Sequence, residues 1–209
     1  MGSELKLHPE ELFVLCDLMD ASLIDYSYIA EMHEIEKNYA KIREKAIQDL
    51  ARARVLSKRL SGEIAVQPDA AALLHNVFEG TESAELEICV TGEQGGISAS
   101  RYHFCDGSVT CIVPKDGEYS VSAVTADGIR STVAAAVGTH AAAAVPADIL
   151  PEKVTRMLTA RRSVVDVGKR ELIVFEQDGG LFLISEDETP QAVSDADAVK
   201  LLYETLIGE

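Results

Sequence analysis

The chain has 209 residues, 47% of them hydrophobic and 26% charged, which is typical of a globular protein and excludes a disordered or collagen-like chain. Its 35 acidic against 19 basic residues give a formal net charge of -16. The electrostatic field of a protein with this net charge repels phosphate backbones and anionic lipids, so composition disfavours nucleic acids and membranes as partners. No apolar run approaches the roughly 18–20 residues that span a bilayer, and the first residues are acidic without an apolar signal-peptide core. We therefore expect a cytoplasmic protein.

The first third of the chain is rich in strong helix formers and has neither proline nor glycine between Pro9 and Gly62. Pro9, followed by two glutamates, predicts the start of a helix over residues 9–20. Apolar residues at steps of three and four from Met32 onward predict a second helix that ends near Arg54. Residues 22–29 fit either a short strand or the entry to that helix.

A small hairpin and a third helix follow. The runs Val55–Ser57 and Ile64–Val66 flank a Ser-Gly turn, and Pro68 opens a helix that reaches about Glu79. The order helix, helix, hairpin, helix is that of a winged-helix segment. We therefore expect residues 9–67 to form a helical, winged-helix-like front segment.

From Ala84 the pattern changes to alternating apolar and polar residues. Strands are predicted near 86–90, 97–105, 109–114 and 119–125, with hairpin turns at Asp106-Gly107 and Asp116-Gly117. Asp127 is expected to cap a helix that ends at Gly138. The result is an antiparallel meander followed by a helix.

The second half of the chain repeats this order. The segments 106–138 and 178–208 both read as turn, strand, acidic turn, strand, Asp cap, helix and glycine. Upstream of each, we expect a helix opened by a proline (Pro68, or Pro146/Pro151) and then strands, over 85–105 and 163–177. The predicted repeat units are about 68–138 and 146–208. The predicted fold is a single α+β domain over 1–209, in which pseudo-twofold duplicated antiparallel meander-plus-helix units form one body.

Residues able to bind metals or catalyse reactions form no recognisable motif. The four cysteines have no CxxC spacing, and the five histidines are scattered, with His33-Glu34 lacking the second histidine of HExxH. The acids at 186–188, 195 and 197 are explained by a turn and a helix start. The sequence thus predicts reduced thiols, no metal ligand, no cofactor and no catalytic residue, although a dispersed triad leaves no local signature. The cysteines and histidines are Cys16, Cys89, Cys105, Cys111, His8, His33, His75, His103 and His140.

One glycine-rich loop stands out, formed by Gly92, Glu93, Gln94, Gly95 and Gly96. It matches no phosphate-binding motif, because it connects a strand to a strand and not to a helix. Binding residues often lie on loops of a rigid scaffold, so these five residues are the predicted partner-binding residues. Eight of the nineteen basic residues lie within 37–59, which keeps nucleic-acid binding by the front segment as an alternative.

The whole chain resembles the EspG-like family of secretion-associated proteins of ESX, or type VII, secretion systems. The resemblance rests on an opening Leu7-His8-Pro9-Glu10-Glu11-Leu12 helix, on the passage Gly62–Leu74 and on the two meander-plus-helix halves. It implies a cytosolic chaperone or adaptor, without catalytic residues or cofactor, that binds a helical secreted protein.

The sequence leaves three possible functions to be tested. The first is a non-enzymatic binding protein, with apolar residues exposed on outward strand faces near 85–90 or 172–175. The second is an enzyme with dispersed catalytic residues, which a pocket holding a histidine and a carboxylate within hydrogen-bond reach would favour. The third is a nucleic-acid-binding regulatory module. Oligomeric state is not predicted.

Overall fold

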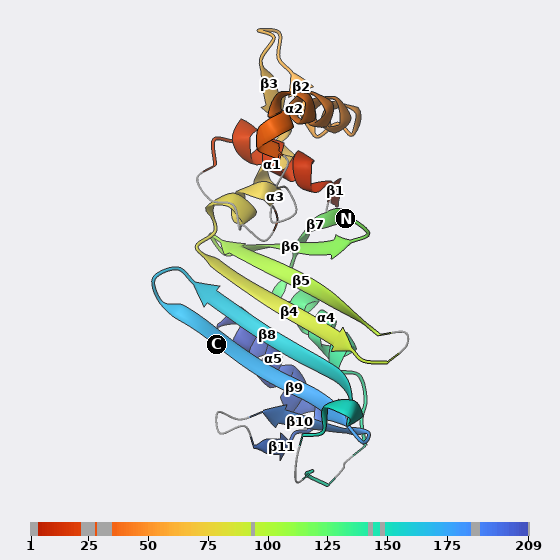
Figure 1. Cartoon of the computed structure of the whole chain (residues 1–209). Helices are drawn as coiled ribbons and strands as arrows, with labels where there is room; N and C mark the ends of the chain where they lie inside the picture. The colour runs from red at the N-terminus through yellow and green to blue at the C-terminus, as the bar shows by residue number, and fades with distance from the viewer. Residues whose placement is uncertain are drawn as a thin grey trace. The chain divides into compact units, whose positions relative to one another are not determined.

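A computed structural model describes residues 4–21, 28, 35–92, 95–141, 144–146, 149–184 and 189–208. The described helices are α1 (Pro9–Leu18), α2 (Ile35–Arg52), α3 (Pro68–Glu79), α4 (Ala126–Val137), α5 (Asp195–Ile207) and the 3-10 helix η2 (Pro151–Lys153). The described strands are β1 (Leu5–Leu7), β2 (Leu56–Lys58), β3 (Ile64–Val66), β4 (Glu82–Val90), β5 (Gly96–Cys105), β6 (Ser108–Lys115), β7 (Glu118–Val124), β8 (Val154–Val164), β9 (Gly168–Gln177), β10 (Gly180–Ile184) and β11 (Pro190–Ala192). The predicted α+β class is confirmed (Figure 1).

Within these residues, nine strands hydrogen-bond in the order β1-β7-β6-β5-β4-β8-β9-β10-β11, and β2 pairs with β3 in a separate hairpin. The chain divides into two compact units. Unit 1 comprises residues 1–81 and 103–123, and unit 2 comprises residues 82–102 and 124–209. Among the described residues, no helix is both long enough and apolar enough to cross a membrane.

Unit 1 contains the N-terminal helices and the hairpin. The predicted order helix, helix, hairpin, helix is confirmed, and α3 has the predicted bounds. Apolar residues at helical spacing on α1, α2 and α3 form its core with Ile112 of β6 and Val121 of β7. β1 pairs antiparallel with β7. Of the ambiguous stretch 22–29, only Tyr28 is described; it is buried, and its hydroxyl lies 2.6 Å from Nε2 of buried His103.

Unit 2 is a sheet with helices on one side. β8 lies between β4 and β9, antiparallel to both, and β10 and β11 continue the sheet. α5 packs on β4, β8 and β9 and beside α4, and both helices lie behind these strands in Figure 1.

The predicted hairpin turns are confirmed: Asp106-Gly107, Asp116-Gly117 and Asp178-Gly179 all have positive φ at both residues, as a type I′ turn requires.

Two arginines of β8 hold the ends of the helices behind the sheet. Nη1 of Arg156 donates to the carbonyl oxygens of Ala136 and Val137 at the C-terminus of α4, at 3.0 and 3.4 Å. Nη1 of Arg162 donates to the carbonyl of Leu206 at the C-terminus of α5, at 2.6 Å. Because these carbonyls have no partner within their own helices, and because the C-terminal end of a helix is electronegative, both contacts stabilise the helix ends.

Two details of the predicted elements are wrong. No α-helix is opened by Pro146 or Pro151 among the described residues of that segment; Pro151 begins only the turn η2, and β8 starts at Val154. The reason is local, because residues 154–159 include three β-branched residues, Val154, Thr155 and Thr159, which favour strands. The N-caps also differ: the Thr125 and Ser194 hydroxyls accept hydrogen bonds from Gly128 and Asp197, whereas Asp127 lies inside the first turn of α4.

The chain order of four strands followed by a helix occurs twice, over β4 to α4 and over β8 to α5. Duplication of one folding unit stays a prediction, because only superposition of the two copies tests it. The acidic turn 186–188 and His33 lie outside the described residues.

Candidate functional site: the open face of unit 2

The face of the unit 2 sheet that points away from α4 and α5 carries a continuous set of side chains. Arg156 and Arg162 of β8 reach the helices, so by alternation Met157, Thr159 and Arg161 point to the other face. The register then places residues of β4 and β9 beside them. We call this surface the open face; it consists of Glu85, Glu87, Cys89, Arg101, Met157, Thr159, Arg161, Glu171 and Ile173.

The open face is charged at one end. Arg161 pairs across the sheet with Glu85 on β4 and Glu171 on β9. Its Nε donates to Glu171 at 2.7 Å, and its Nη1 donates to Glu85 at 3.2 Å and to Glu87 at 3.5 Å. Nε of Arg101 donates to the other Glu85 oxygen at 2.7 Å. The hydrogen bond to Glu171 is the main reason that the pKa of Arg161 is raised, so this guanidinium is a permanent charge.

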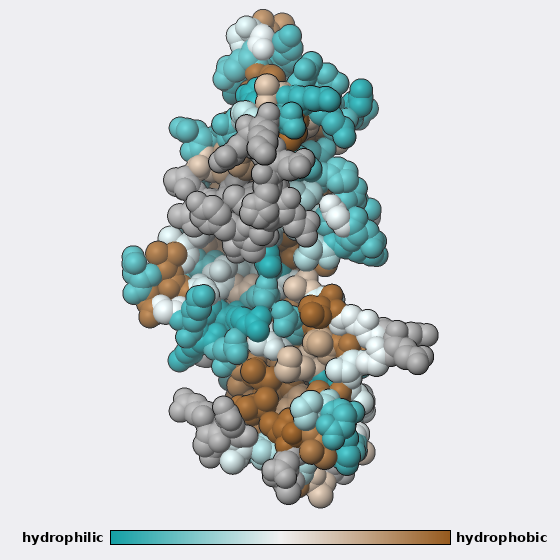
Figure 2. Space-filling model, in the orientation of Figure 1, coloured by the Kyte–Doolittle hydropathy of each residue, from teal (hydrophilic) through white to brown (hydrophobic). Residues whose placement is uncertain are grey.

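The other end of the open face is apolar. Cys89, Met157 and Ile173 are half-buried there, while Thr159 between them is fully buried. Figure 2 shows the same division, with hydrophilic side chains over part of β4, β8 and β9 and hydrophobic ones adjoining them. Of the strand segments expected to expose apolar residues, Val90 is 40% exposed but pairs with Arg156 and so lies on the side of the helices. On the open face, Ile173 is half-buried and Phe175, which pairs with Met157, is buried. The open face thus places half-buried apolar side chains next to fixed charges.

The glycine-rich loop joins two strands of this sheet, as predicted. It connects β4 to β5, and the Gly95 amide donates to the Gly92 carbonyl at 3.0 Å. Gly92 has φ +99, and a Cβ at Gly95 would collide with the carbonyl oxygen of Val90, so both positions need glycine. Gly96 is exposed at the start of β5, and Glu93 and Gln94 lie outside the described residues. The partner-binding role of the five residues stays a prediction.

Unit 2 also holds a pocket of about 510 Å³, lined by His140, Leu181, Val193, Ser194 and Asp195 among others. Nδ1 of His140 lies 2.9 Å from Oδ1 of Asp195, and the His140 amide donates to Oδ2 at 3.0 Å. These hydrogen bonds, the backbone one first, hold the pKa of Asp195 below its ordinary value. Neither residue was predicted as a site, because 55 residues separate them in the sequence.

The arrangement at this pocket fits a structural role as well as a chemical one. Nε2 of His140 lies 3.5 Å from a carboxylate oxygen of Glu176, so each ring nitrogen faces an acid. The Ser194 hydroxyl accepts from the Asp197 amide and lies 2.6 Å from its carboxylate, as an N-cap. These contacts fasten the segment after α4 to the start of α5.

The cysteines are all free thiols, as expected. Cys16 and Cys111 are buried, and desolvation raises the pKa of each to about 11. Cys89 lies on the open face, and Cys105 ends β5. One group of potential metal ligands is found among the described residues, formed by His75, Cys105 and Asp106; sequence spacing gave no signal for it.

The architecture defined above, a strand meander with helices on one face joined to an N-terminal helical segment, is a fold already seen in solved structures. The chain is similar to the Mycobacterium tuberculosis type VII secretion system chaperone EspG5, in a structure of its complex with the PE25-PPE41 dimer. The TM-score is 0.66 and the sequence identity 10%, and the match covers 98% of this chain and 97% of that one. No protein-family model matches the chain, and neither does any curated protein sequence. The similarity is therefore one of fold.

Proposed function

We propose that this chain is a non-enzymatic chaperone or adaptor that binds a helical secreted protein of a type VII-like secretion system, in the cytoplasm. The observation that carries the proposal is the fold similarity to a chaperone over nearly the full length of both chains. That chaperone was solved with the PE25-PPE41 dimer, which suggests the kind of partner to test.

The open face is the proposed docking surface. It combines apolar side chains, Met157 and Ile173, with a charged cluster around Arg161 that is already held in place by hydrogen bonds. A fixed cluster loses little side-chain entropy on binding, and the adjoining apolar groups supply the burial that stabilises a complex. The loop Gly92–Gly96 adjoins this surface at the end of β4 and is the proposed rim.

The test is coexpression with small helical proteins encoded beside the gene, followed by affinity measurement on purified complexes. Ile173→Glu places a carboxylate in the apolar end of the open face. Loss of one central apolar contact there should weaken binding by about tenfold or more. Ala135→Glu adds the same charge to the exposed side of α4 and serves as the matched control.

Equal binding by both variants, with unchanged melting temperatures, would remove the open face from the proposal. Failure of any such protein to bind the unmodified chain would count against the chaperone function itself. A complex that forms and is weakened only by Ile173→Glu supports both.

A second candidate, an enzyme with dispersed catalytic residues, is favoured by the pocket in which His140 and Asp195 meet. Weighing against it, both ring nitrogens of His140 face carboxylates, and the neighbouring Ser194 hydroxyl is engaged as a helix cap. Hydrolysis of simple esters or phosphoesters by the purified chain, lost in His140→Gln, would favour the enzyme. Turnover unaffected by that substitution would exclude this pocket as its site.

A further inference from the structure

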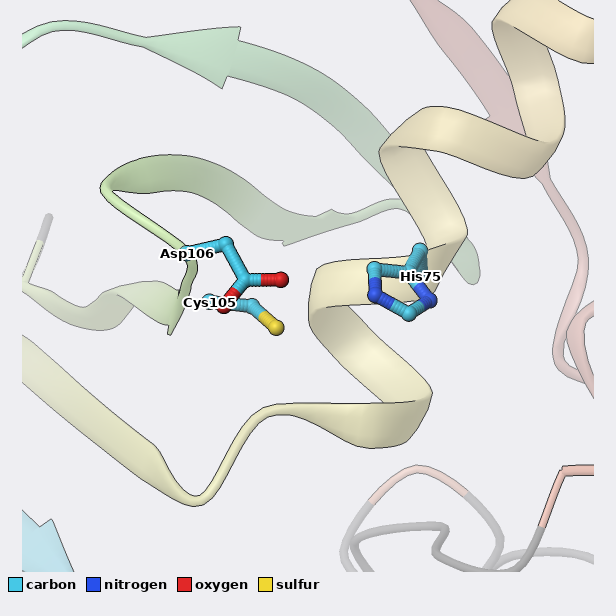
Figure 3. Close-up of side chains that lie close together, drawn as sticks. All are labelled: His75, Cys105 and Asp106. Carbon is cyan, nitrogen blue, oxygen red and sulfur yellow. The ribbon is translucent and has the colours of Figure 1, made fainter.

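Three side chains with different donor atoms converge in unit 1. His75 lies on the exposed side of α3, Cys105 ends β5, and Asp106 is the first residue of the β5–β6 turn. One nitrogen, one sulfur and one oxygen, all lying within 4.8 Å of one another, are available from these three residues. Figure 3 shows the Cys105 sulfur and the Asp106 carboxylate pointing toward the side of α3 that carries His75.

The backbone around these donors is held rigidly. Asp106 and Gly107 have φ of 50° and 76°, which fixes the tight turn. The Ser108 hydroxyl, 2.8 Å from the Cys105 carbonyl oxygen, closes the same turn. The residue after His75 is tied to this hairpin as well, because Oδ1 of Asn76 lies 3.0 Å from the Ser108 hydroxyl.

Buried polar contacts extend this connection to the next strand. Nδ2 of Asn76 donates to the Thr110 hydroxyl at 3.1 Å, and that hydroxyl donates to the Leu73 carbonyl at 2.9 Å. Both side chains are buried, so breaking either hydrogen bond would leave a buried polar group unsatisfied. The helix that carries His75 and the turn that carries Cys105 and Asp106 therefore keep a fixed spacing.

Gly80, which follows α3, lies beside the end of β5. A Cβ at Gly80 would collide with the Asn76 carbonyl oxygen and lie 3.0 Å from that of Phe104. This close approach brings the last turn of α3 to the end of β5. The donors thus meet because of the packing of the backbone, and not only by the choice of side-chain rotamers.

The charges around the three donors favour a cation. The carboxylates of Asp106 and Glu79 both interact electrostatically with the Cys105 thiol, so the site already carries negative charge. Glu79 is four residues after His75 and therefore on the same side of α3. Over the part of the chain that the structure describes, no lysine or arginine forms a salt bridge with Asp106 or Glu79.

We propose that His75, Cys105 and Asp106 bind a divalent transition-metal ion of the zinc class. Imidazole nitrogen, thiolate sulfur and carboxylate oxygen are the three ligand types that zinc takes, and this mixed set disfavours Mg²⁺ and Ca²⁺, which take oxygen ligands. Tetrahedral bonds of about 2.0–2.3 Å place ligand atoms about 3.3–3.8 Å apart, so the donors need only close by rotamer changes. Glu79 or a water molecule completes the coordination, and the Cys105 thiol releases its proton to solvent as the metal–sulfur bond forms.

The experiment is titration of the purified full chain with Co²⁺ and Zn²⁺. Bound Co²⁺ reports a coordinated thiolate through its charge-transfer absorption, and Zn²⁺ should then displace it. Cys105→Ser and His75→Ala should each lower the affinity by at least about tenfold, because loss of a residue that only supports a ligand already costs about 10–100-fold. Cys89→Ser is the matched control, since it removes another half-buried cysteine in the other unit.

The expected result is one equivalent of Co²⁺, a thiolate band present in the unmodified chain and in Cys89→Ser, and no band in Cys105→Ser. Unchanged melting temperatures of the metal-free variants would show that each is folded. The absence of a thiolate band in the unmodified chain, or its persistence in Cys105→Ser, would overturn the proposal. Equal affinity of the chain for Mg²⁺ and Zn²⁺ would also overturn the proposal.

Discussion

Replacing Arg162 by methionine tests how the end of α5 is held against the sheet. The guanidinium of Arg162 is buried, donates to the Leu206 carbonyl at 2.6 Å and pairs with Glu82. Methionine keeps most of the apolar stem but removes the hydrogen bond, and it leaves that carbonyl without this donor. A hydrogen bond from a charged group contributes about 1.5–3 kcal/mol, and a cation at a partly buried helix C-terminus adds up to about 2 kcal/mol.

The ion pair with Glu82 adds little to this sum. The Glu82 side chain is 39% exposed, so water replaces its partner, and the pair itself contributes at most about 1 kcal/mol. We therefore expect Arg162→Met to lower the free energy of unfolding by about 2–4 kcal/mol, or the melting temperature by about 4–16 °C for a chain of this size. Thermal unfolding followed by circular dichroism measures this change.

Arg161→Met is the control, because it makes the same substitution one residue away on the opposite face of β8. The Arg161 side chain is 41% exposed and its ion pairs are solvated, so its loss should cost about 1 kcal/mol or less. If Arg161→Met lowered the free energy of unfolding as much as Arg162→Met does, the distinction between the two faces of β8 would be refuted. A melting temperature of Arg162→Met within about 1 °C of the unmodified chain would refute it as well.

Three further predictions follow from single contacts. Gly208→Ala should lower the free energy of unfolding by more than the roughly 1 kcal/mol that a non-glycine residue at positive φ costs, because its Cβ would lie 2.8 Å from the Arg162 guanidinium. In an Arg162→Ala background the additional loss of stability should vanish. Strict additivity of the two substitutions in a double-mutant cycle would contradict this prediction. Asp195→Asn should lower the melting temperature near neutral pH and progressively less as pH falls below the ordinary pKa of 3.8. The pKa of Asp195 is lowered in the folded chain, so the stability it contributes is lost as the folded carboxylate protonates; Asp127→Asn, in the first turn of α4, should show a smaller effect. At pH 8, iodoacetamide should modify Cys89 well before Cys16 and Cys111, whose pKa values are both about 11, and a mass spectrum with the two buried thiols modified first would contradict this order.

Local chemistry made much of the fold predictable from the sequence. Proline at the start of α3 and Asp-Gly at three turns fix backbone angles within a few residues, so these positions are confirmed. The segment after Pro151 was misjudged because proline also opens a 3-10 turn, and the β-branched residues that follow it continue as β8. The N-caps were misplaced by the abundance of acids in first turns, where Asp127 interacts with the helix dipole while Thr125 makes the cap.

The candidate sites depend on contacts between distant residues, which local patterns do not encode. Arg161 meets Glu85 and Glu171 only through the register of three strands. His75 and Cys105 come together only because α3 packs on β6 and Asn76 of α3 hydrogen-bonds to the β5–β6 hairpin. The alternation of residues along a strand could have predicted that Arg161 points outward. Its partners on β4 and β9 could be predicted only with knowledge of the strand order, in which β4 pairs with β8 after a long connection.

Alkylation of Cys89 in the presence and absence of a bound helical protein tests the proposed docking surface most directly. Cys89 lies in the apolar end of the open face, beside Met157. Docking there should sharply slow the modification of Cys89 while leaving that of Cys105 in unit 1 unchanged. A stable complex in which Cys89 reacts as fast as in the free chain would contradict binding at the open face.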